Sequence, residues 1–522
     1  MSDKILDKFP RIGYPVTLAK VDNQYTFLGD PLPEESLIEF LDIRTSEGMR
    51  TYERTLVFLL DYVAKKRGVT IKIEHSYGNA IFGRFLKGRL NLNLAKKEIE
   101  KLIKERKNIE KLMLPKLEAI QYLRNREDDV NILLHLAASY IPVYKINDFP
   151  AYFAGPLLPN TGFISVFDIK AIKDGFLIIL PSKEEPFKLG EVEERKKLFK
   201  TYKEAKKEAE ILRIWDAAQL NRYIINGEIS EILNIAEVLH SEKITEICRK
   251  IIKRRKEIHI VLIGGPSSSG KTTFSKRLGI HLRSHGFFPV CVSLDDYFLE
   301  RSETPQYKDG THFFDSIYAL DLKLFREHIL NLLKGEKVRL PRFNFKTGKR
   351  EYQKKLTELE ENSILIVEGL HTFNPEVLKG INVNPFLIYV SPLTQLNINR
   401  VNRIPTRDLR LLRRIFRDTR YRGHDAEYTL KKWESVKDGE EQFIFPYQER
   451  ADVMFNSSLV YELAVLKAFL ETPLRCVPTS SPFYCEALRL LTFLSHFLDI
   501  QEKEIPRTSI LREFIGGSAF LY

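Results

Sequence analysis

The chain has 522 residues, of which 82 are Lys or Arg and 70 are Asp or Glu, so its formal net charge is +12. Single hydrophobic cores stop growing at ~250–300 residues, and this length therefore predicts several domains. A composition of 43% hydrophobic and 29% charged residues excludes a mainly disordered chain. No apolar run approaches the ~18–20 residues of a membrane-spanning helix, and no secretory signal is expected. The four cysteines contain no Cys-x-x-Cys pair, which excludes a disulfide scaffold and favours a cytoplasmic location.

The N-terminal part predicts two small domains and a connector. Residues 1–45 show short alternating apolar segments separated by Pro, Gly and Asn, typical of a β-rich module. Residues 46–182 predict an α+β domain, with a helix from about Gly48 to Gly68 followed by the strand VTIKIEHS. Residues 183–250 predict a helical connector. Its stretch from Glu184 to Leu212 mixes Lys and Glu at helical spacing, which indicates a solvated helix rather than a nucleic-acid arm.

Residues 251–472 predict an α/β domain. The segments IHIVLIGG, VCVSL, ILIVEG and FLIYVS are nearly continuous apolar strands with helical segments between them. Such strands are typical of a parallel sheet that is covered on both faces. Residues 473–522 predict a helix, EALRLLTFLSHFLDI, and then an extended tail that contains Gly516 and Gly517.

A phosphate-binding loop follows the first of these strands. The segment GPSSSGKT matches GxxxxGK[ST] at every fixed position and opens a predicted helix. Glycines let the backbone curl so that its N–H groups point at phosphate oxygens, and the helix N-terminus adds partial positive charge. Lys271 is expected at the β- and γ-phosphates and Thr272 at Mg²⁺. The predicted ATP contacts are Gly265, Pro266, Ser267, Ser268, Ser269, Gly270, Lys271, Thr272 and Thr273.

Two further strands end in carboxylates. Asp295 and Asp296 follow the strand VCVSL, and strand ends of an open α/β sheet face the ligand crevice. Asp295 is the candidate base that accepts a proton from an attacking hydroxyl; Asp296 could act instead, or either residue could cap the next segment. Glu368 ends the strand ILIVE, a position suited to Mg²⁺.

An arginine series follows the last strand. Its members, spaced to share one helix face, are Arg403, Arg407, Arg410, Arg414 and Arg417. Beside them an apolar stripe contains Leu409, Leu412 and Phe416; Pro405-Thr406 predicts the helix start and Gly423 its stop. We interpret this helix as a lid that closes over a triphosphate. A nucleic-acid surface is the alternative, but no interleaved aromatic residues support base stacking.

The α/β domain resembles the uridine–cytidine kinase and phosphoribulokinase family of P-loop kinases. The resemblance is carried, in family order, by GPSSSGKTT, SLDDYF, HFFDSIYALD, LPRFNFKTGKR, ILIVEG and LRRIFRDTRYRGHD. It implies that the γ-phosphate of ATP is transferred to a sugar hydroxyl, with Asp295 as base and Glu368 at Mg²⁺. It also implies that Asp315 and Arg414 hold ribose hydroxyls and that Arg417 and Arg422 grip ATP phosphates.

The match departs from the uridine–cytidine kinases at the base pocket. Where these enzymes carry Tyr and His, this chain has Phe343 and Gly348, and His424 replaces a lid arginine near the base. A phenyl ring can stack on a base but cannot hydrogen-bond its edge. The acceptor is therefore either a nucleoside or another small polyol or phosphosugar.

The N-terminal part resembles threonyl-tRNA synthetase. Residues 11–45 are similar to its small β-grasp domain and residues 46–180 to its editing-type domain, through GMRTYERTLVFLL, IEHSYGNAIFGRF and GPLLPNTGFISVF. The four positions that carry metal-ligand or catalytic residues in that pattern are Arg54, Phe58, Phe153 and Leu157 here. None of these side chains can bind a metal or carry a proton at neutral pH, so we expect the editing chemistry to be absent. His75 is interpreted as structural.

The sequence supports two hypotheses about function, which belong to different classes of protein. The first is an ATP- and Mg²⁺-dependent kinase for a small hydroxyl compound, with a synthetase-like module that could sense a ligand and gate the kinase. The second is an RNA- or tRNA-associated NTPase, motivated by the +12 charge. The mixture of Lys and Glu in the first 200 residues disfavours tRNA binding. No membrane partner is expected, and the oligomeric state is left open.

Overall fold

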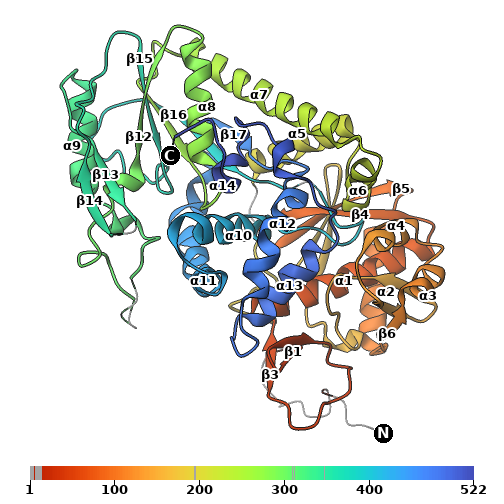
Figure 1. Cartoon of the computed structure of the whole chain (residues 1–522). Coiled ribbons are helices and arrows are strands. Elements are labelled where there is room, and N and C mark those ends of the chain that lie inside the picture. The colour runs from red at the N-terminus through yellow and green to blue at the C-terminus, as the bar shows by residue number, and fades with distance from the viewer. Residues whose placement is uncertain are drawn as a thin grey trace.

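The computed structural model describes residue 5 and residues 15–192, 195–307, 310, 312–345, 347–394 and 396–521. Within these ranges no helix is both long enough and apolar enough to cross a membrane. Figure 1 shows the chain with the N-terminal strands at one end and the kinase-type sheet at another.

The N-terminal module is a three-stranded antiparallel sheet with the order β2-β1-β3. Its strands are β1 (Val16–Val21), β2 (Gln24–Thr26) and β3 (Ile38–Asp42). The predicted short strands of residues 15–45 are thus confirmed, whereas most of residues 1–14 lie outside the described ones.

The second region surrounds the long helix α1 (Ser46–Lys66), whose start is set by Thr45 accepting a hydrogen bond from the Gly48 amide at 3.1 Å. The middle of α1 is buried on all sides, since every residue from Thr55 to Asp61 is buried, and its apolar side chains belong to the core of this region. Two antiparallel sheets, β4-β5-β10-β9 and β6-β7-β8, complete it. The other elements are β4 (Thr70–Tyr77), β5 (Ala80–Lys87), α2 (Leu92–Lys104), β6 (Glu110–Pro115), α3 (Lys116–Tyr122), α4 (Glu127–His135), β7 (Tyr140–Ile146), β8 (Phe149–Tyr152), β9 (Asp168–Ile172) and β10 (Gly175–Ile179).

The connector contains α5 (Lys196–Leu212), α6 (Ala217–Ile225) and α7 (Ile229–Lys253). The prediction of one solvated helix from Glu184 to Leu212 is wrong in two respects. Residues 184–192 are not helical, because Pro186 and Gly190 interrupt them and the Ser182 hydroxyl accepts hydrogen bonds from the next turn. One face of α5 is also buried.

The kinase-type domain contains a parallel sheet of five strands in the order β12-β15-β11-β16-β17. The strands are β11 (Ile260–Gly264), β12 (Phe288–Ser293), β15 (Ser363–Glu368), β16 (Pro385–Ser391) and β17 (Val453–Asn456). The first four confirm the predicted apolar strands; the short edge strand β17 was not predicted. The strands β11, β15 and β16 are almost wholly buried, and because the sheet is parallel the carboxyl ends of its strands lie at one edge.

Helices and a hairpin surround this sheet. They are α8 (Lys271–Arg283), α9 (Leu322–Leu333), β13 (Pro341–Asn344), β14 (Lys349–Tyr352), α10 (Thr406–Arg417), α11 (Ala426–Phe443), α12 (Glu462–Arg475), α13 (Tyr484–Leu494) and α14 (Arg512–Ile515). The predicted start of α10 after Pro405 is confirmed, and Gly423, with φ +70°, ends the π-helical turn that continues it. The predicted extended tail is wrong, because it folds into α14 and packs on α10 (Figure 1).

Buried ion pairs tie α10 and the segment before it to the N-terminal region. Asp408 is 2% exposed and accepts hydrogen bonds from Arg50 of α1 at 3.0 Å and from Arg489 of α13 at 2.8 Å. Upstream, the Arg400 guanidinium pairs with Asp61 of α1 at 2.5 Å. The helix that borders the phosphate loop is therefore fixed by residues far from it in sequence.

We expect Asp408→Asn to destabilise the protein by about 3–5 kcal/mol, because the partly buried guanidinium groups of Arg50 and Arg489 lose the buried carboxylate that they share. The change is measured as the shift of the urea unfolding midpoint. Asp174→Asn is the matched control, since Asp174 pairs with Lys203 through side chains that are 53% and 42% exposed. A control effect of about 0.5 kcal/mol or less is expected. Equal shifts for both variants would contradict the prediction.

Candidate active site

The phosphate loop connects β11 to α8 and needs glycine at two of its bends. Gly265 has φ +154°, and a Cβ there would lie 2.0 Å from the Val390 carbonyl oxygen. Gly270, with φ +85°, precedes the first residue of α8. Ser268 also has a positive φ, +57°. The loop therefore has the curled backbone that the sequence predicted for it.

Buried arginines of α10 hold this loop from outside. The Arg410 guanidinium donates to the Ser267 carbonyl at 3.0 Å and pairs with Glu440 of α11, which accepts from the Ser267 amide at 3.0 Å. Arg413 pairs with Glu462 at 2.5 Å and stacks on the Phe514 ring of α14. Arg410 and Arg413 are only 1% and 0% exposed. They brace the loop, and Arg410 is not part of a solvated lid face.

The other predicted lid arginines divide into two groups. Arg403 lies before α10 and pairs with Glu53 of α1, and Arg407 pairs with Glu441. In contrast, the guanidinium groups of Arg414, Arg417 and Arg422 share one carboxylate, that of Asp418, at 3.1–3.6 Å. Arg414 also donates to the Ser267 hydroxyl at 2.9 Å. Burial and the neighbouring arginines lower the pKa of Arg422 to about 9. Positive charge therefore exceeds negative charge beside the loop.

Lys271 begins α8 and is 7% exposed. Its ammonium group donates to the Pro266 carbonyl at 3.1 Å. Burial lowers the pKa of Lys271, although the nearby carboxylates of Glu368 and Asp295 oppose this effect. The lysine thus lies between the loop and the two carboxylates that the sequence placed at strand ends.

The structure distinguishes Asp295 from Asp296. The Asp296 carboxylate accepts a hydrogen bond from the Phe343 amide of β13 at 3.0 Å, and burial raises its pKa to about 6. Within the described residues the Asp295 carboxylate has no hydrogen-bond or ion-pair partner, yet its charge acts on Lys271 and Arg422. Asp296 therefore anchors the hairpin, whereas Asp295 faces the site.

Glu368 lies at the end of β15 and is 7% exposed. Its carboxylate accepts a hydrogen bond from the Ser293 hydroxyl at 2.8 Å. Burial and the charge of Asp295 raise its pKa, against the effect of Lys271. No cluster of three or more His, Cys, Asp or Glu side chains suited to a metal occurs in the described part of the chain. A Mg²⁺ ion in a kinase usually takes only one or two carboxylates together with substrate phosphates, so Glu368 with Thr272 fits such an ion.

The predicted acceptor residues lie around the same edge. Burial raises the pKa of Asp315, and the positive charge of Arg414 opposes this shift. The Phe343 ring packs on Phe298 and Phe345, with centroids 5.6 and 5.2 Å apart. The Arg422 guanidinium lies 4.9 Å from the Phe345 centroid. These contacts form an apolar, aromatic wall beside Asp296.

Gly348, with φ +68°, contacts Arg301, and His424 stacks on Tyr428 at 4.1 Å.

Two residues at this site were missed by the sequence analysis. His371 follows Glu368 by three positions and is 2% exposed; burial and the charge of Lys271 lower its pKa to about 3, so the ring is neutral. The sequence signal that could have identified His371 is its position shortly after an acidic residue at a strand end. Glu513 of α14 accepts hydrogen bonds from the Thr273 amide at 3.0 Å and the Thr273 hydroxyl at 2.8 Å. No pattern in the tail sequence indicated this contact.

The N-terminal positions of the synthetase pattern have structural contacts. Phe58 and Phe153 pack edge to face with centroids 5.7 Å apart, and Arg54 donates to the Pro156 carbonyl at 2.9 Å. Leu157 is fully buried. His75 stacks on Tyr202 of α5 with centroids 3.6 Å apart, and burial lowers its pKa to about 3. These side chains belong to the core and its borders.

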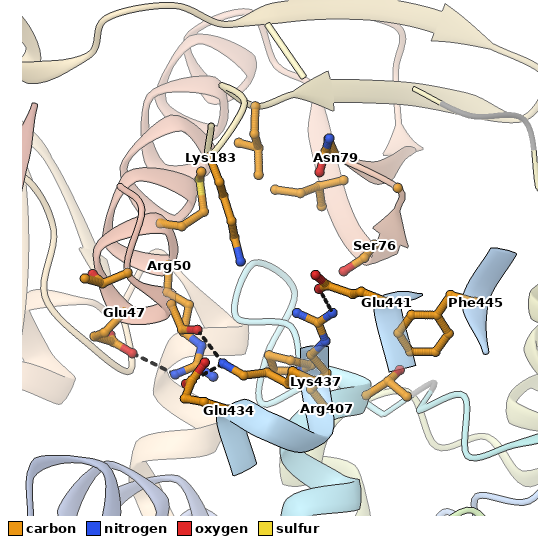
Figure 2. A pocket seen from close by; sticks show the side chains of 18 of the residues that line it. Glu47, Arg50, Ser76, Asn79, Lys183, Arg407, Glu434, Lys437, Glu441 and Phe445 are labelled. Atoms are coloured by element: carbon orange, nitrogen blue, oxygen red, sulfur yellow. Dashed lines mark hydrogen bonds and ion pairs between the residues drawn. The ribbon is translucent and has the colours of Figure 1, made fainter. Parts of the chain in front are cut away.

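A cavity of about 1190 Å³ lies between the N-terminal region and the kinase-type domain. Figure 2 shows Lys183 extending into it, above the pairs Arg407–Glu441 and Lys437–Glu434. Burial and the charge of Arg407 lower the pKa of Lys183. The lining comes from both regions and includes Arg403, Arg407 and Arg410, so the cavity borders the first half of α10 and the segment before it.

We expect Asp296→Asn to stabilise the protein at pH 7.5 but not near pH 4. The raised pKa of Asp296 means that the folded state retains this proton up to about pH 6, whereas the unfolded state releases it near pH 4. The wild-type protein thus loses stability as the pH rises through this window, and the amide variant does not. Thermal unfolding of both proteins at the two pH values measures the difference; an equal shift at both would contradict the assignment.

Comparisons with known proteins find sequence similarity in the region that contains this site. Residues 260–463 match the model of the phosphoribulokinase / uridine kinase family. A uridine kinase of Anoxybacillus flavithermus is 26% identical over 201 residues, which are 38% of this chain and 86% of that protein. A uridine kinase of Borrelia garinii subsp. bavariensis is 29% identical over 221 residues, 41% of this chain and 94% of that protein.

A solved structure described as a possible uridine kinase from Bacillus stearothermophilus is 21% identical, with a TM-score of 0.27, and the match covers 41% of this chain and 97% of that one. The resemblance of residues 11–180 to threonyl-tRNA synthetase stays a prediction. The C-terminal region of this chain contains a P-loop kinase domain of the phosphoribulokinase / uridine kinase family.

Proposed function

We propose that the protein transfers the γ-phosphate of ATP to a hydroxyl group of a nucleoside or a related small molecule. The observation that carries this proposal is the position of Asp295, which has no hydrogen-bond or ion-pair partner within the described residues and lies within electrostatic reach of Lys271 and Arg422. A base at the end of a strand, beside a phosphate loop, is placed to accept a proton from an attacking hydroxyl.

In the proposed step, the acceptor oxygen forms a bond to the γ-phosphorus while the bond from that phosphorus to the β–γ bridging oxygen breaks. The hydroxyl proton passes to the Asp295 carboxylate, and the bond electrons leave with ADP. Lys271 holds the β- and γ-phosphates, and Arg417 and Arg422 balance the charge on the transferring group. When bound, Mg²⁺ supplies further charge stabilisation; Thr272 and Glu368 would hold it.

The acceptor is a compound with vicinal hydroxyls and a flat apolar part. Asp315 and Arg414 lie near one another and together offer an acceptor and donors for such hydroxyls. The wall of Phe298, Phe343 and Phe345 favours the face of a ring. Because phenyl rings cannot read the edge of a base, we expect weak discrimination between uridine and cytidine, and a polyol or phosphosugar is the alternative acceptor.

The direct test measures ADP formation from ATP and Mg²⁺ over a panel of nucleosides, pentoses and small polyols, and identifies the phosphorylated product by mass. Lys271→Ala, which removes the phosphate-binding cation, is the negative control. A supporting result is a compound that the wild-type protein phosphorylates and Lys271→Ala does not. The proposal fails if the panel contains no such compound.

We expect Asp295→Asn to lower kcat by about 10²–10⁴-fold and to leave the Kd for ATP within about threefold, because a general base acts in the chemical step. Asp296→Asn is the matched control and should retain kcat within about fivefold. Steady-state kinetics and calorimetric ATP titrations measure the two quantities. Loss of turnover in Asp296→Asn alone would transfer the role to Asp296.

We propose, second, that the N-terminal region gates the kinase. Two observations favour this: the chain segment that leads into α10 is bonded to the N-terminal region, and both regions line the large cavity beside α10. A change in the N-terminal region would therefore move a helix whose Arg414 contacts Ser267 of the phosphate loop.

We expect Glu53→Gln, which breaks the pair with Arg403, to change the KM for ATP by about fivefold or more, the lower end of the usual coupling between sites. Glu98→Gln is the control, since the pairs of Glu98 within the described residues are those with Lys66 and Arg67 at the far end of α1. Kinetics and thermal unfolding are measured together. Identical KM values for the wild-type protein and Glu53→Gln would argue against gating.

A further inference from the structure

The C-terminal tail reaches the phosphate loop through Glu513. Its carboxylate accepts two hydrogen bonds from Thr273, one from the backbone amide at 3.0 Å and one from the hydroxyl at 2.8 Å. Thr273 lies in the first turn of α8, whose amide groups point towards the phosphate site. The partial positive charge of a helix N-terminus favours an anion at this place. Among the described residues, Glu513 forms no ion pair.

The donors that Glu513 uses are ones that a P-loop is expected to offer to a nucleotide phosphate. In a P-loop the amides that start the helix cradle the α- and β-phosphates of the nucleotide. The carboxylate also lies close enough to Lys271 and Glu368 to affect the pKa of both side chains. Two anions cannot use the same donors, and at a separation of a few ångströms in a protein they repel each other strongly.

The tail is held at the loop by packing as well as by this contact. The Ile510 side chain lies against Gly270, so that a Cβ on this glycine would approach it to 2.9 Å. The Phe514 ring lies 4.9 Å from the Arg413 guanidinium. Arg512 donates to the Glu502 carboxylate at 2.8 Å and to the Gly516 carbonyl at 3.1 Å. Ile510, Leu511, Phe514 and Ile515 are fully buried. These contacts fix the backbone that presents Glu513.

We propose that Glu513 is an autoinhibitory residue, whose carboxylate occupies the phosphate site and must leave Thr273 before a nucleotide binds there. The inference rests on the proposed function only in taking the loop as an ATP site. Rotation of the Glu513 side chain or displacement of α14 would free the Thr273 donors. Nucleotide binding and tail docking are then competing events.

The test compares the Kd for ATP, by calorimetry, in the wild-type protein, Glu513→Gln and Glu513→Ala. Removal of the carboxylate charge should tighten ATP binding by about tenfold or more. Glu504→Gln is the matched control, because Glu504 is an exposed acid of the same tail whose carboxylate, among the described residues, accepts a hydrogen bond from the Ser230 hydroxyl. Its Kd should equal that of the wild-type protein. Thermal unfolding of each protein without nucleotide shows that the tail variants are folded.

The sign of the effect decides the proposal. An unchanged Kd in both Glu513 variants, or no ATP binding to any of the proteins, would overturn it. Weaker ATP binding would also overturn it, and would assign Glu513 to nucleotide binding instead. Failure of the kinase proposal is a separate result: ATP would bind more tightly to Glu513→Gln, but no acceptor in the hydroxyl panel would be phosphorylated.

Discussion

The burial of charged side chains on α10 is the constraint on which the remaining structure depends. Asp408, Arg410 and Arg413 are each at most 2% exposed, and an unpaired charge at such a position would be prohibitively costly. Each therefore requires a partner, and the partners come from α1, α11, α12 and α13. The same helix contacts the carbonyl groups of Ser267 and Ser268. The geometry of the phosphate loop is thus set by packing that includes the N-terminal region, and this packing is the physical basis of the proposed gating.

Charge at the site is separated rather than paired. On one side, Arg414, Arg417 and Arg422 share the single carboxylate of Asp418. On the other side, the carboxylates of Asp295 and Glu368 lie near Lys271, and the charge of Asp295 raises the pKa of Glu368. Such a distribution is unfavourable in the empty site, because like charges face one another. A bound triphosphate would neutralise the arginines, and a divalent cation would neutralise the acids. The separation therefore favours a ligand that carries both signs.

Much of the kinase domain could be predicted because its signals are local. The Gly265–Thr272 motif, the apolar strands and the caps of α10 each depend on residues adjacent in sequence. The roles of the arginines could not be predicted. Helical spacing places Arg410 and Arg414 on one face of the helix, but it does not show that Glu440 lies opposite Arg410. The choice between Asp295 and Asp296 also required the hairpin amide of Phe343. For Glu513 the decisive contact joins residues 240 positions apart, and no local pattern reports it.

The segments outside the family match converge on the machinery inside it. The matched region ends at residue 463, whereas Arg489 and Glu513 lie beyond it and Arg50 lies long before it. Arg50 and Arg489 contact Asp408, which lies on the helix that braces the phosphate loop. Glu513 contacts Thr273, which lies at the loop. If the added segments served only to stabilise the fold, apolar packing would suffice, and burial of charge at this place would only add cost. A charged contact from the tail at Thr273, and charged contacts from α1 and α13 on the helix that braces the loop, fit the proposed control of this site better than a purely stabilising role.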